Sequence, residues 1–420
     1  MSSEQIKKMQ QKKFLKLVSY IAQHSPYYQE VIKKNNIDIA VCKPEDFPIL
    51  TKEIVIEYFD QMVTDSKITK KAITRFLTLS HNPTELFLNK YYVVHTSGSS
   101  RKIGYYAYTP EELARGIVHF TRINRPSLGQ KLAYVATANE RFAGATMVNS
   151  AKLIPFIYQD IRLFDIDTPF SEILTALQEF QPTSLGGYAF ALRKIAEAQK
   201  AGKLLIKPRI IQSGGEPLTI NNKKFIEDSL KAPIVNVYAA SEHFIMGIGK
   251  DSYGGMYLME DDLIFELHDT HTCITNLFNY TLPLIRYKMD DQLEKIQDAV
   301  QALSFTKISP VIGRKEHDPI FLNDSGEEDF ISSKLLDTNI KNVASFQLHL
   351  LSKSAFVFMG CLEKGLDRKT IQKTKNGISE TLQDLLQKKL MTNVTFTIEI
   401  VDHLWADPKT GKFRLIVKKY

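Results

Sequence analysis

The sequence predicts an α/β fold, with a large N-terminal domain of mixed and parallel sheets followed by a small α+β domain. Short strand patterns alternate with helical patterns from about residue 93 to about residue 238, as in parallel sheets with crossover helices. The 420 residues exceed the usual size of one domain. Beyond about residue 313 the pattern changes to paired strands and one charged helix. The expected division is therefore 1–312 and 313–420.

Two helix starts are marked by capping patterns. Ser2 and Gln5 have the spacing of a capping box, and apolar residues at 14, 17, 18 and 21 share one face of the helix that follows. This helix should end before Pro26, because the residue preceding a proline disfavours helical geometry. Thr109 and Glu112 frame a second start, with a proline between them at the first helical position.

The remaining strands and helices are predicted from apolar runs and from the Gly, Pro and polar residues that separate them. We expect strands at 92–94, 131–138, 209–212 and 234–238, and helices at 171–180, 188–201 and 220–231. In the second domain we expect strands at 346–351, 355–359 and 394–401, and a helix at 368–389. Ligand sites in parallel sheets lie at the carboxyl ends of strands, where the Ser/Gly-rich segments of this chain fall.

Composition excludes several classes of protein. Hydrophobic residues make up 44% of the chain and charged residues 24%, so global disorder is excluded. The net charge of +7 suits a polyanionic small molecule but is too small and dispersed for nucleic acid. Cys42, Cys273 and Cys361 lie far apart and form neither a disulfide framework nor a C-x-x-C site. With no signal peptide or spanning segment visible, we expect a cytoplasmic protein without membrane insertion.

Three segments in the first half carry candidate chemistry. Residues 95–102 read HTSGSSRK, whose hydroxyls, glycine and cations suit phosphate groups. Residues 213–218 read SGGEPL, where paired glycines permit close approach to a flat ligand. In 236–242, NVYAASE, Tyr238 could stack on a base and Glu242 could hold a hard cation. Each segment taken alone is more often an ordinary turn or a buried tyrosine.

Three further segments follow. Residues 282–291 read LPLIRYKMDD and place Asp291 at a strand end, where an acid can bind ribose hydroxyls. Residues 311–315, VIGRK, stand at the expected domain boundary. Residues 407–414, DPKTGKFR, present Lys412 on a glycine turn, from which its ammonium could reach a distant anion. The alternatives are a surface turn and an ordinary basic C-terminus.

In this order the six segments resemble the adenylate-forming superfamily of acyl-CoA synthetases and carrier-protein-loading domains. That superfamily has a Thr-Ser-Gly-Ser-Thr-Gly-type phosphate loop, a Gly-Gly-Glu-Pro segment, a Tyr-Gly-x-(Thr/Ser)-Glu segment, a Tyr-Arg-x-Gly-Asp segment, a Gly-Arg hinge and a late lysine. Residues 25–28, SPYY, and 47–52, FPILTK, are similar to the phenylacetate–CoA ligase and capsule-synthesis-associated branch.

The resemblance implies an ATP- and Mg²⁺-dependent ligase that forms an acyl-adenylate from a small carboxylic acid and passes the acyl group to CoA. It implies phosphate contacts from Thr96, Ser97, Gly98, Ser99, Ser100 and Lys102. It implies adenine and ribose contacts from Gly215, Glu216, Pro217, Tyr238, Asp291 and Arg314. Glu242 would bind the metal, and Lys412 would bridge the carboxylate and the α-phosphate.

The resemblance also implies an acid pocket and a moving domain. The pocket would be lined by Tyr134, Phe142, Gly144, Gly186, Gly187, Tyr188 and Ala240, which suits an apolar or aromatic acid. The small domain would be mobile and rotate about residues 313–318, withdrawing Lys412 before the thiol attacks. No nucleic acid partner is implied, and a homodimer is compatible with the family.

Several positions depart from the family pattern. Arg101 stands where the phosphate loop usually has its last glycine, and Ile103 where a proline usually follows the lysine. Ala239 and Asp290 replace two further glycines, and the usual acidic pair after the hinge is blurred in 315–318. Arg101 either serves as an additional phosphate cation or weakens ATP use.

Three functions therefore stay open at this point. The first is an acid–CoA ligase. The second is an enzyme of the same chemistry that loads a carrier-protein phosphopantetheine arm. The third is a non-catalytic member that binds a nucleotide or a partner, against which the retention of Glu242, Asp291 and Lys412 argues.

Overall fold

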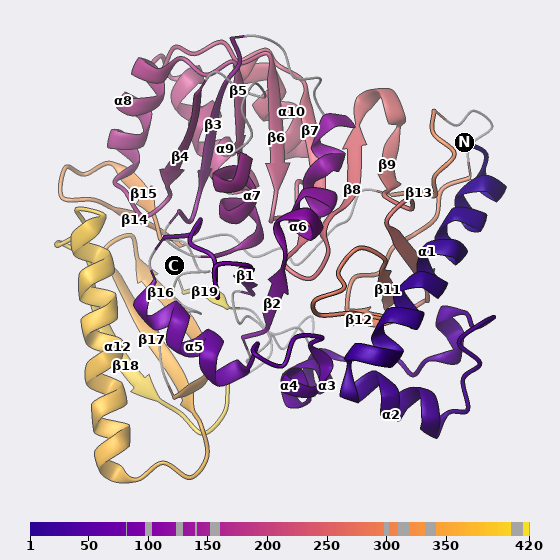
Figure 1. Cartoon of the computed structure of the whole chain (residues 1–420). Coiled ribbons are helices and arrows are strands. Elements are labelled where there is room, and N and C mark those ends of the chain that lie inside the picture. The colour runs from indigo at the N-terminus through magenta and orange to yellow at the C-terminus, as the bar shows by residue number, and fades with distance from the viewer. Residues whose placement is uncertain are drawn as a thin grey trace.

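The computed structural model describes residues 1–80, 82–96, 103–122, 129–138, 141–151, 160–297, 302–309, 319–331, 342–404 and 415–419 (Figure 1). Among these residues the largest sheet has eight strands in the order β13-β9-β8-β7-β6-β5-β3-β4. Its parallel strands are β3 (Lys131–Ala136), β4 (Asp160–Asp165), β5 (Ser184–Gly187), β6 (Ile210–Gly214) and β7 (Ile234–Ala240). Its antiparallel strands are β8 (Phe244–Lys250), β9 (Gly255–Leu258) and β13 (Lys307–Ile308). The predicted α/β class with a mixed sheet is confirmed.

Helices alternate with the parallel strands. The predicted helices near 171–180, 188–201 and 220–231 are confirmed, and a further helix at 143–151 was not predicted. The helices are α7 (Ala143–Ala151), α8 (Phe170–Phe180), α9 (Ala189–Lys200) and α10 (Ile220–Leu230). Their apolar faces pack on the sheet in one core, which includes Leu177, Leu192, Ile211 and Ile226. The helix expected from Thr109 is α6 (Pro110–Ile117), with the predicted capping box present, and a 3-10 turn (Val118–Arg122) follows it.

The N-terminal helices and the smaller sheets share a second core. These helices are α1 (Ser3–His24), α2 (Pro26–Lys34), α3 (Lys52–Glu57), α4 (Phe59–Met62) and α5 (Lys70–Leu79). The capping box at Ser2 is present, and α1 buries the predicted apolar face. The small sheets pair β1 (Tyr92–His95) with β2 (Tyr105–Tyr108), and β10 (Leu263–Leu267) with β11 (Thr272–Asn276) and β12 (Tyr287–Met289). Short 3-10 turns lie at Pro44–Asp46 and Asp251–Tyr253.

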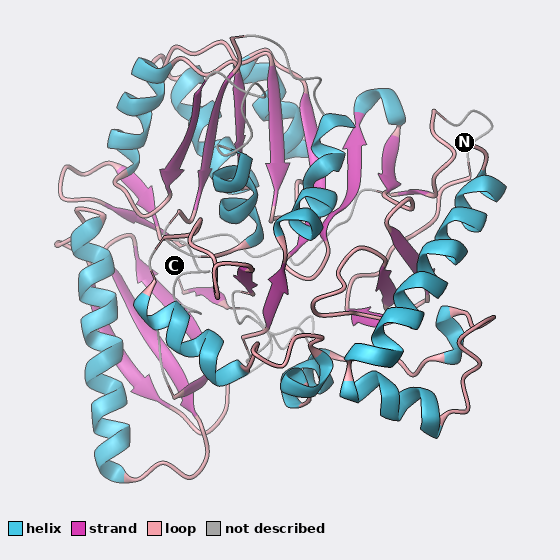
Figure 2. Cartoon of the chain, in the orientation of Figure 1, coloured by secondary structure: helices cyan, strands magenta, loops and turns pink. Residues whose placement is uncertain are grey.

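The C-terminal part has its own sheet and its own core. The sheet orders β18 (Thr395–Ile400), β17 (Ala355–Leu362), β16 (Val343–Ser352) and β19 (Ile416–Lys418), and α12 (Arg368–Lys388) packs on it. A hairpin of β14 (Ile320–Leu322) and β15 (Glu328–Phe330) precedes it in the chain. The predicted strands and helix are confirmed here, while the expected boundary at 312 and 313 lies outside the described residues. Figure 2 shows this sheet and its long helix beside the central sheet.

A buried ion pair within the C-terminal part lies against the loop before α8. The Lys389 and Asp329 side chains are each 1% exposed, and their charged atoms lie 3.0 Å apart. Lys389 also donates to the carbonyls of Ile166, at 3.1 Å, and Thr168, at 2.9 Å. Phe330 from β15 joins the apolar core of the parallel sheet. The two cores are therefore linked by both a charged and an apolar contact.

Within the described part of the chain, none of the helices has the length and apolar composition that crossing a lipid bilayer requires.

Candidate active site

The carboxyl ends of the parallel strands bring several predicted segments to one edge of the sheet. Gly187 of β5 pairs with Ser213 of β6, and Gly214 pairs with Val237 of β7. The turns after these strands therefore start side by side, toward the middle of the molecule in Figure 1. Glu242 follows the end of β7 in this group.

Glu242 is a buried carboxylate held by two tyrosines. It stands in the turn that connects β7 to β8, and the residue is 6% exposed. The hydroxyls of Tyr106 and Tyr287 each donate to its Oε1 atom at 3.2 Å, and the two hydroxyls lie 3.1 Å apart. Burial raises the pKa of Glu242, and the nearby ammonium of Lys52 lowers it in part. Among the described residues, the groups that donate to this carboxylate are neutral hydroxyls, a setting that suits a metal ion.

Lys52 links the N-terminal helices to the predicted phosphate segment. It is the first residue of α3, and its Nζ donates to Thr96 Oγ1 at 3.1 Å. The same hydroxyl oxygen accepts from Gly104 N at 3.0 Å, and Thr96 N donates to the Gly104 carbonyl at 3.1 Å. Thr96 and Gly104, which lie on either side of residues 97–103, are therefore bonded to each other beside the ammonium group of Lys52. Of residues 95–102, the structure describes His95 and Thr96.

The turn that carries Glu242 is fixed by buried hydrogen bonds. Tyr108 donates its hydroxyl to the carbonyls of Ser241, at 2.7 Å, and Glu242, at 2.8 Å. Ser241 donates its hydroxyl to the carbonyl of His95 at 2.9 Å. Asn276 contacts the Glu242 carbonyl at 3.4 Å. These bonds join the ends of β1 and β7, so the position of the carboxylate depends on residues far apart in the sequence.

Sequence reasoning did not identify Lys52, Tyr106 or Tyr287 as site residues. Lys52 stands in the segment 47–52, which indicated the family branch, and Tyr287 stands in the segment 282–291, where only Asp291 received a role. The alternation of tyrosines in 105–108 places Tyr106 and Tyr108 on one face of β2, and both are fully buried. This spacing could have indicated a polar partner in the interior, because two buried tyrosines on one face of a strand need hydrogen-bond partners for their hydroxyls.

Tyr238 and Asp291, predicted for adenine and ribose, are in direct contact. The Tyr238 hydroxyl donates to Asp291 Oδ2 at 2.8 Å. Thr272 donates its hydroxyl to the Asp291 carbonyl at 2.9 Å. Burial and the Asp291 charge raise the pKa of Tyr238 well above its usual value, so the phenol stays protonated and donates. A β-bulge between Tyr238 and Ala239 sets the direction of the following turn.

The residues predicted for the acid pocket surround Tyr134. A Cβ at Gly186 would lie 2.5 Å from the Tyr134 ring, and one at Gly144 would lie 3.1 Å from its hydroxyl oxygen. Tyr134 is 7% exposed, and Tyr188 and Glu216 act electrostatically on it. The glycines thus make room for the ring of this chain's own tyrosine, which limits the volume left there for a ligand.

The remaining pocket residues lie along the same edge. The Phe142 ring packs on the His95 ring with centroids 4.9 Å apart, and Ala240 ends β7. Gly187 has φ +155, and a Cβ there would lie 2.4 Å from the Val135 carbonyl oxygen, so this position requires glycine.

The adenine segment after β6 also has described geometry. Gly215 has φ +74, in the region that favours glycine. Glu216 accepts from the Phe190 backbone N–H at 3.0 Å, at the start of α9, and Pro217 follows it before α10. The Glu216 carboxylate is thereby directed to a helix N-terminus, where negative charge is stabilised.

The other predicted site residues lie outside the described part of the chain. They are Ser97, Gly98, Ser99, Ser100, Lys102, Arg314 and Lys412, together with the variant Arg101. Their roles stay predictions.

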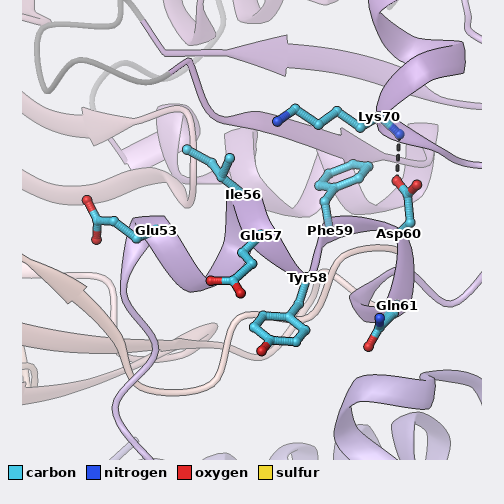
Figure 3. Close-up of a pocket in the computed structure, with 8 residues that line it drawn as sticks. All are labelled: Glu53, Ile56, Glu57, Tyr58, Phe59, Asp60, Gln61 and Lys70. Carbon is cyan, nitrogen blue, oxygen red and sulfur yellow. Dashed lines mark hydrogen bonds between the residues drawn. The ribbon is translucent and has the colours of Figure 1, made fainter. Parts of the chain in front are cut away.

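A separate hollow of about 540 Å³ lies on the N-terminal helices. Figure 3 shows the carboxylates of Glu53, Glu57 and Asp60 around it, with Asp60 accepting from the backbone N–H of Lys70 at 2.6 Å. The remaining lining residues are Ile56, Tyr58, Phe59 and Gln61. It contains none of the predicted site residues, and its acidic lining is unsuited to phosphates, so it is not the ATP site.

Comparisons with known proteins bear on the whole chain. No protein-family model matches it. Over 428 residues it is 26% identical to protein CapK of Staphylococcus aureus, covering 97% of this chain and 88% of CapK. A solved 2-hydroxyisobutyryl-CoA ligase, in complex with 2-HIB-AMP and CoA in the thioesterification state, superposes with a TM-score of 0.63 at 14% identity, covering 100% of this chain and 91% of that chain.

The same ligase in the postadenylation state with 2-HIB-AMP gives a TM-score of 0.59 at 16% identity, covering 100% of this chain and 90% of that chain. These similarities extend over nearly the whole length of both chains. They confirm the fold and the resemblance that the six segments predict.

Proposed function

Because the chain resembles the adenylate-forming superfamily and its capsule-synthesis-associated branch, we propose that it activates a carboxylic acid with ATP and transfers the acyl group to a thiol, that of CoA. In the first step a carboxylate oxygen attacks the α-phosphorus of ATP, the bond to the β-phosphate breaks, and pyrophosphate leaves. In the second step a thiol sulfur attacks the acyl carbon and AMP leaves.

The observation that carries this proposal is the position of the buried Glu242 at the edge that also holds Tyr238 and Asp291. Its charge is held by neutral hydroxyls, with an ammonium group acting from Lys52. Buried carboxylates of raised pKa in such positions are candidates for ligand or metal binding. Parallel-sheet proteins bind nucleotides at this edge.

Mg²⁺ fits the donor atoms at this position. Glu242 supplies a carboxylate oxygen in an oxygen-rich setting, and a hard cation prefers oxygen ligands from one or two carboxylates and substrate phosphates. Glu242 would hold the ion, with Oε1 already engaged by the two tyrosines. When bound, the ion would neutralise phosphate oxygens.

The chain's own residues supply alignment. Tyr238 would stack on adenine while its hydroxyl orients Asp291 toward the ribose, with Arg314 beside it. Thr96 and the loop that follows would bind phosphates, and Lys52 would add positive charge at the base of that loop. Lys412 would approach the reacting carboxylate and α-phosphate. Holding reactants in line and neutralising their charges accounts for most of the rate in such chemistry.

Residues 313–420 form the small domain of this proposal, and its rotation would exchange the two half-reactions. The similar 2-hydroxyisobutyryl-CoA ligase is solved in thioesterification and postadenylation states, which supports two arrangements for this fold. The acid is expected to be apolar or aromatic, and the ring of Tyr134 beside Gly144 and Gly186 favours a small one.

The test is ATP–pyrophosphate exchange by the full-length protein with a panel of short, branched and aryl acids. Exchange that depends on one acid class supports adenylation. CoA and a phosphopantetheinyl carrier protein are then offered together as acceptors of the acyl group. If a thioester forms with the carrier protein alone, the carrier protein is the acceptor and CoA is not. A folded protein that binds ATP yet exchanges with no acid would contradict the proposal and favour the non-catalytic alternative.

A further inference from the structure

The hairpin of β10 and β11 carries two histidines and a cysteine on one face, outside the site described above. His268 and His271 flank the turn, and the His268 N–H donates to the His271 carbonyl at 3.0 Å. Cys273 lies two residues after His271, so both side chains emerge on the same face of the strand. One ligand atom of each of the three residues lies within 4.8 Å of the others.

The imidazole of His271 is arranged as a metal ligand would be. Its Nε2 atom is buried and has no hydrogen-bond partner among the residues that the structure describes. Its Nδ1 atom lies 3.0 Å from Thr270 Oγ1, a contact that orients the ring and leaves Nε2 available as a ligand atom. A buried polar atom without a partner is unfavourable and calls for an explanation, which a bound ion would supply.

The other two ligands complete a compact set. The His268 ring stacks on the His271 ring with centroids 4.6 Å apart and 18° between the planes. Cys273 is fully buried beneath them as a free thiol. Ligand atoms of a tetrahedral zinc site lie about 3.3–3.6 Å apart, given its bond lengths. Side-chain rotations that move these ligand atoms by about an ångström would therefore place all three within bonding distance of one ion.

Charges around the cluster are balanced. Glu266 is the residue opposite Cys273 in the register of the hairpin, and its carboxylate accepts from the Arg286 guanidinium at 2.8 Å. Lys288 pairs with Cys273 on the other side and is exposed to solvent. Asp290 follows β12 and acts electrostatically on His271. The acids offset the cations, so an ion would be accepted without a large repulsion.

We propose that His268, His271 and Cys273 bind one zinc ion, with water in the fourth position. Two imidazoles and a thiolate form the borderline-soft donor set that zinc selects and Mg²⁺ does not. The opposite face of the same strand carries Thr272, which holds the Asp291 carbonyl. A zinc ion here therefore stiffens the strand on which the proposed ribose contact rests.

The test uses the full-length protein freed of metal by a chelator, without ATP or Mg²⁺. Equilibrium dialysis with Zn²⁺ alone should give one ion per chain. Co²⁺ in place of Zn²⁺ should give a thiolate charge-transfer band. His268→Gln and Cys273→Ser should each weaken Zn²⁺ binding at least tenfold, and Cys273→Ser should remove the Co²⁺ band. Zn²⁺ should slow amide exchange in β10 and β11 of the wild type but not of His268→Gln.

Controls separate this site from general thiol or imidazole binding. Cys361→Ser removes a partly exposed thiol elsewhere, and His24→Gln removes an exposed imidazole; both should bind Zn²⁺ as the wild type does. His268 is exposed, so its variant should fold even if Cys273→Ser does not. No Zn²⁺ bound by the folded wild type would overturn the proposal, as would undiminished binding by His268→Gln. Because no acid or ATP is present, failure of the adenylation proposal leaves this result unaffected.

Discussion

Two buried carboxylates in this protein are held in opposite ways. Asp329, at the junction of the C-terminal part, lies 3.0 Å from the Lys389 ammonium. It also accepts from the backbone N–H groups of Phe170, at 2.9 Å, and Phe330, at 2.7 Å. Its charge is therefore matched by an ion pair and by charge-assisted hydrogen bonds inside the protein.

Glu242 has no such match among the described residues. Its close donors are the neutral hydroxyls of Tyr106 and Tyr287, and the Lys52 ammonium is bonded to Thr96. Burial accordingly raises its pKa. The comparison distinguishes a buried charge that is satisfied within the protein from one that is short of positive charge and is therefore a candidate for ligand binding.

The largest expected effect concerns Lys412, whose ammonium group we propose to approach the reacting carboxylate and the α-phosphate. Lys412→Ala should reduce adenylate formation by about two to three orders of magnitude, the range for loss of a preorganised electrostatic contact. Thioester formation from a supplied acyl-adenylate should stay near the wild-type rate. Single-turnover assays of each half-reaction measure both. Lys409→Ala is the matched control, and equal damage to both steps would contradict domain rotation.

The junction carboxylate should respond in stability instead. Asp329→Asn leaves the Lys389 ammonium buried without its counter-charge, and should lower the free energy of unfolding by about 3–5 kcal/mol. The double variant with Lys389→Met should recover much of that loss. Urea unfolding measures both. Glu327→Gln removes an exposed pair with Lys203 and should change stability by less than about 1 kcal/mol. Unchanged stability in Asp329→Asn would make the pair irrelevant to the junction.

A substitution of Lys52 tests whether the region around Thr96 binds the phosphates of ATP. Lys52→Met keeps the aliphatic length but removes the ammonium beside Thr96, and should raise the KM for ATP by about ten- to a hundredfold, as for a lost charge-assisted contact. Steady-state kinetics over a range of ATP concentrations test this. Lys43→Met, an exposed lysine in the same N-terminal segment, should leave the KM unchanged. An unaltered KM in Lys52→Met would confine Lys52 to a structural role.

The smallest effect is on stability and depends on pH. The raised pKa of Glu242 means that the folded state binds its proton more tightly than the unfolded state does. The resulting stability is fully present below the unfolded value, near pH 4.5, and is lost as the pH rises through the folded value. Glu242→Gln cannot ionise, so at pH 7 it should melt about 1–3 °C above the wild type. The difference should shrink toward pH 4.5.

Glu112 provides the matched control for that experiment. It is also a buried glutamate, and burial raises its pKa as well. Its two oxygens, however, accept from Thr109, Tyr280 and Thr281, at 2.7 to 2.9 Å. Glu112→Gln turns an amide group toward these donors and should lower the melting temperature. A Glu242→Gln variant that melts as low as Glu112→Gln would show that Glu242 is also a structural carboxylate.

Local sequence patterns predicted much of the fold. Capping at Thr109 and Glu112, and the alternation of strands and helices up to β7, are set by residues close in the chain. The strands Asp160–Asp165 and Ser184–Gly187 were not predicted, because the first is short and ends in an aspartate on each side, and the second contains two glycines, which are rare in strands. The helix Ala143–Ala151 was not predicted either. The antiparallel strands β8 to β11 were also missed, although turn residues such as Asp251 and Gly254 separate them, because the prediction centred on the segments that carry candidate chemistry.

The candidate site was predicted only in part for a related reason. Tyr238, Glu242 and Asp291 stand in segments whose order indicates a family. The contact of Tyr106 with Glu242 joins residues 136 positions apart, and that of Lys389 with Asp329 joins the end of a helix to an earlier hairpin. Such contacts follow from tertiary packing, which no local period encodes.

The most direct test of the account is ATP–pyrophosphate exchange by Glu242→Gln beside the wild type, with Mg²⁺ and the acid that the wild type accepts. The variant keeps the shape of the side chain and its acceptor oxygen for Tyr106 and Tyr287, and removes only the charge. We predict a fall of at least a hundredfold in a protein that remains folded and melts no lower than the wild type. Exchange at the wild-type rate would contradict the claim that the uncompensated charge of Glu242 serves the reaction.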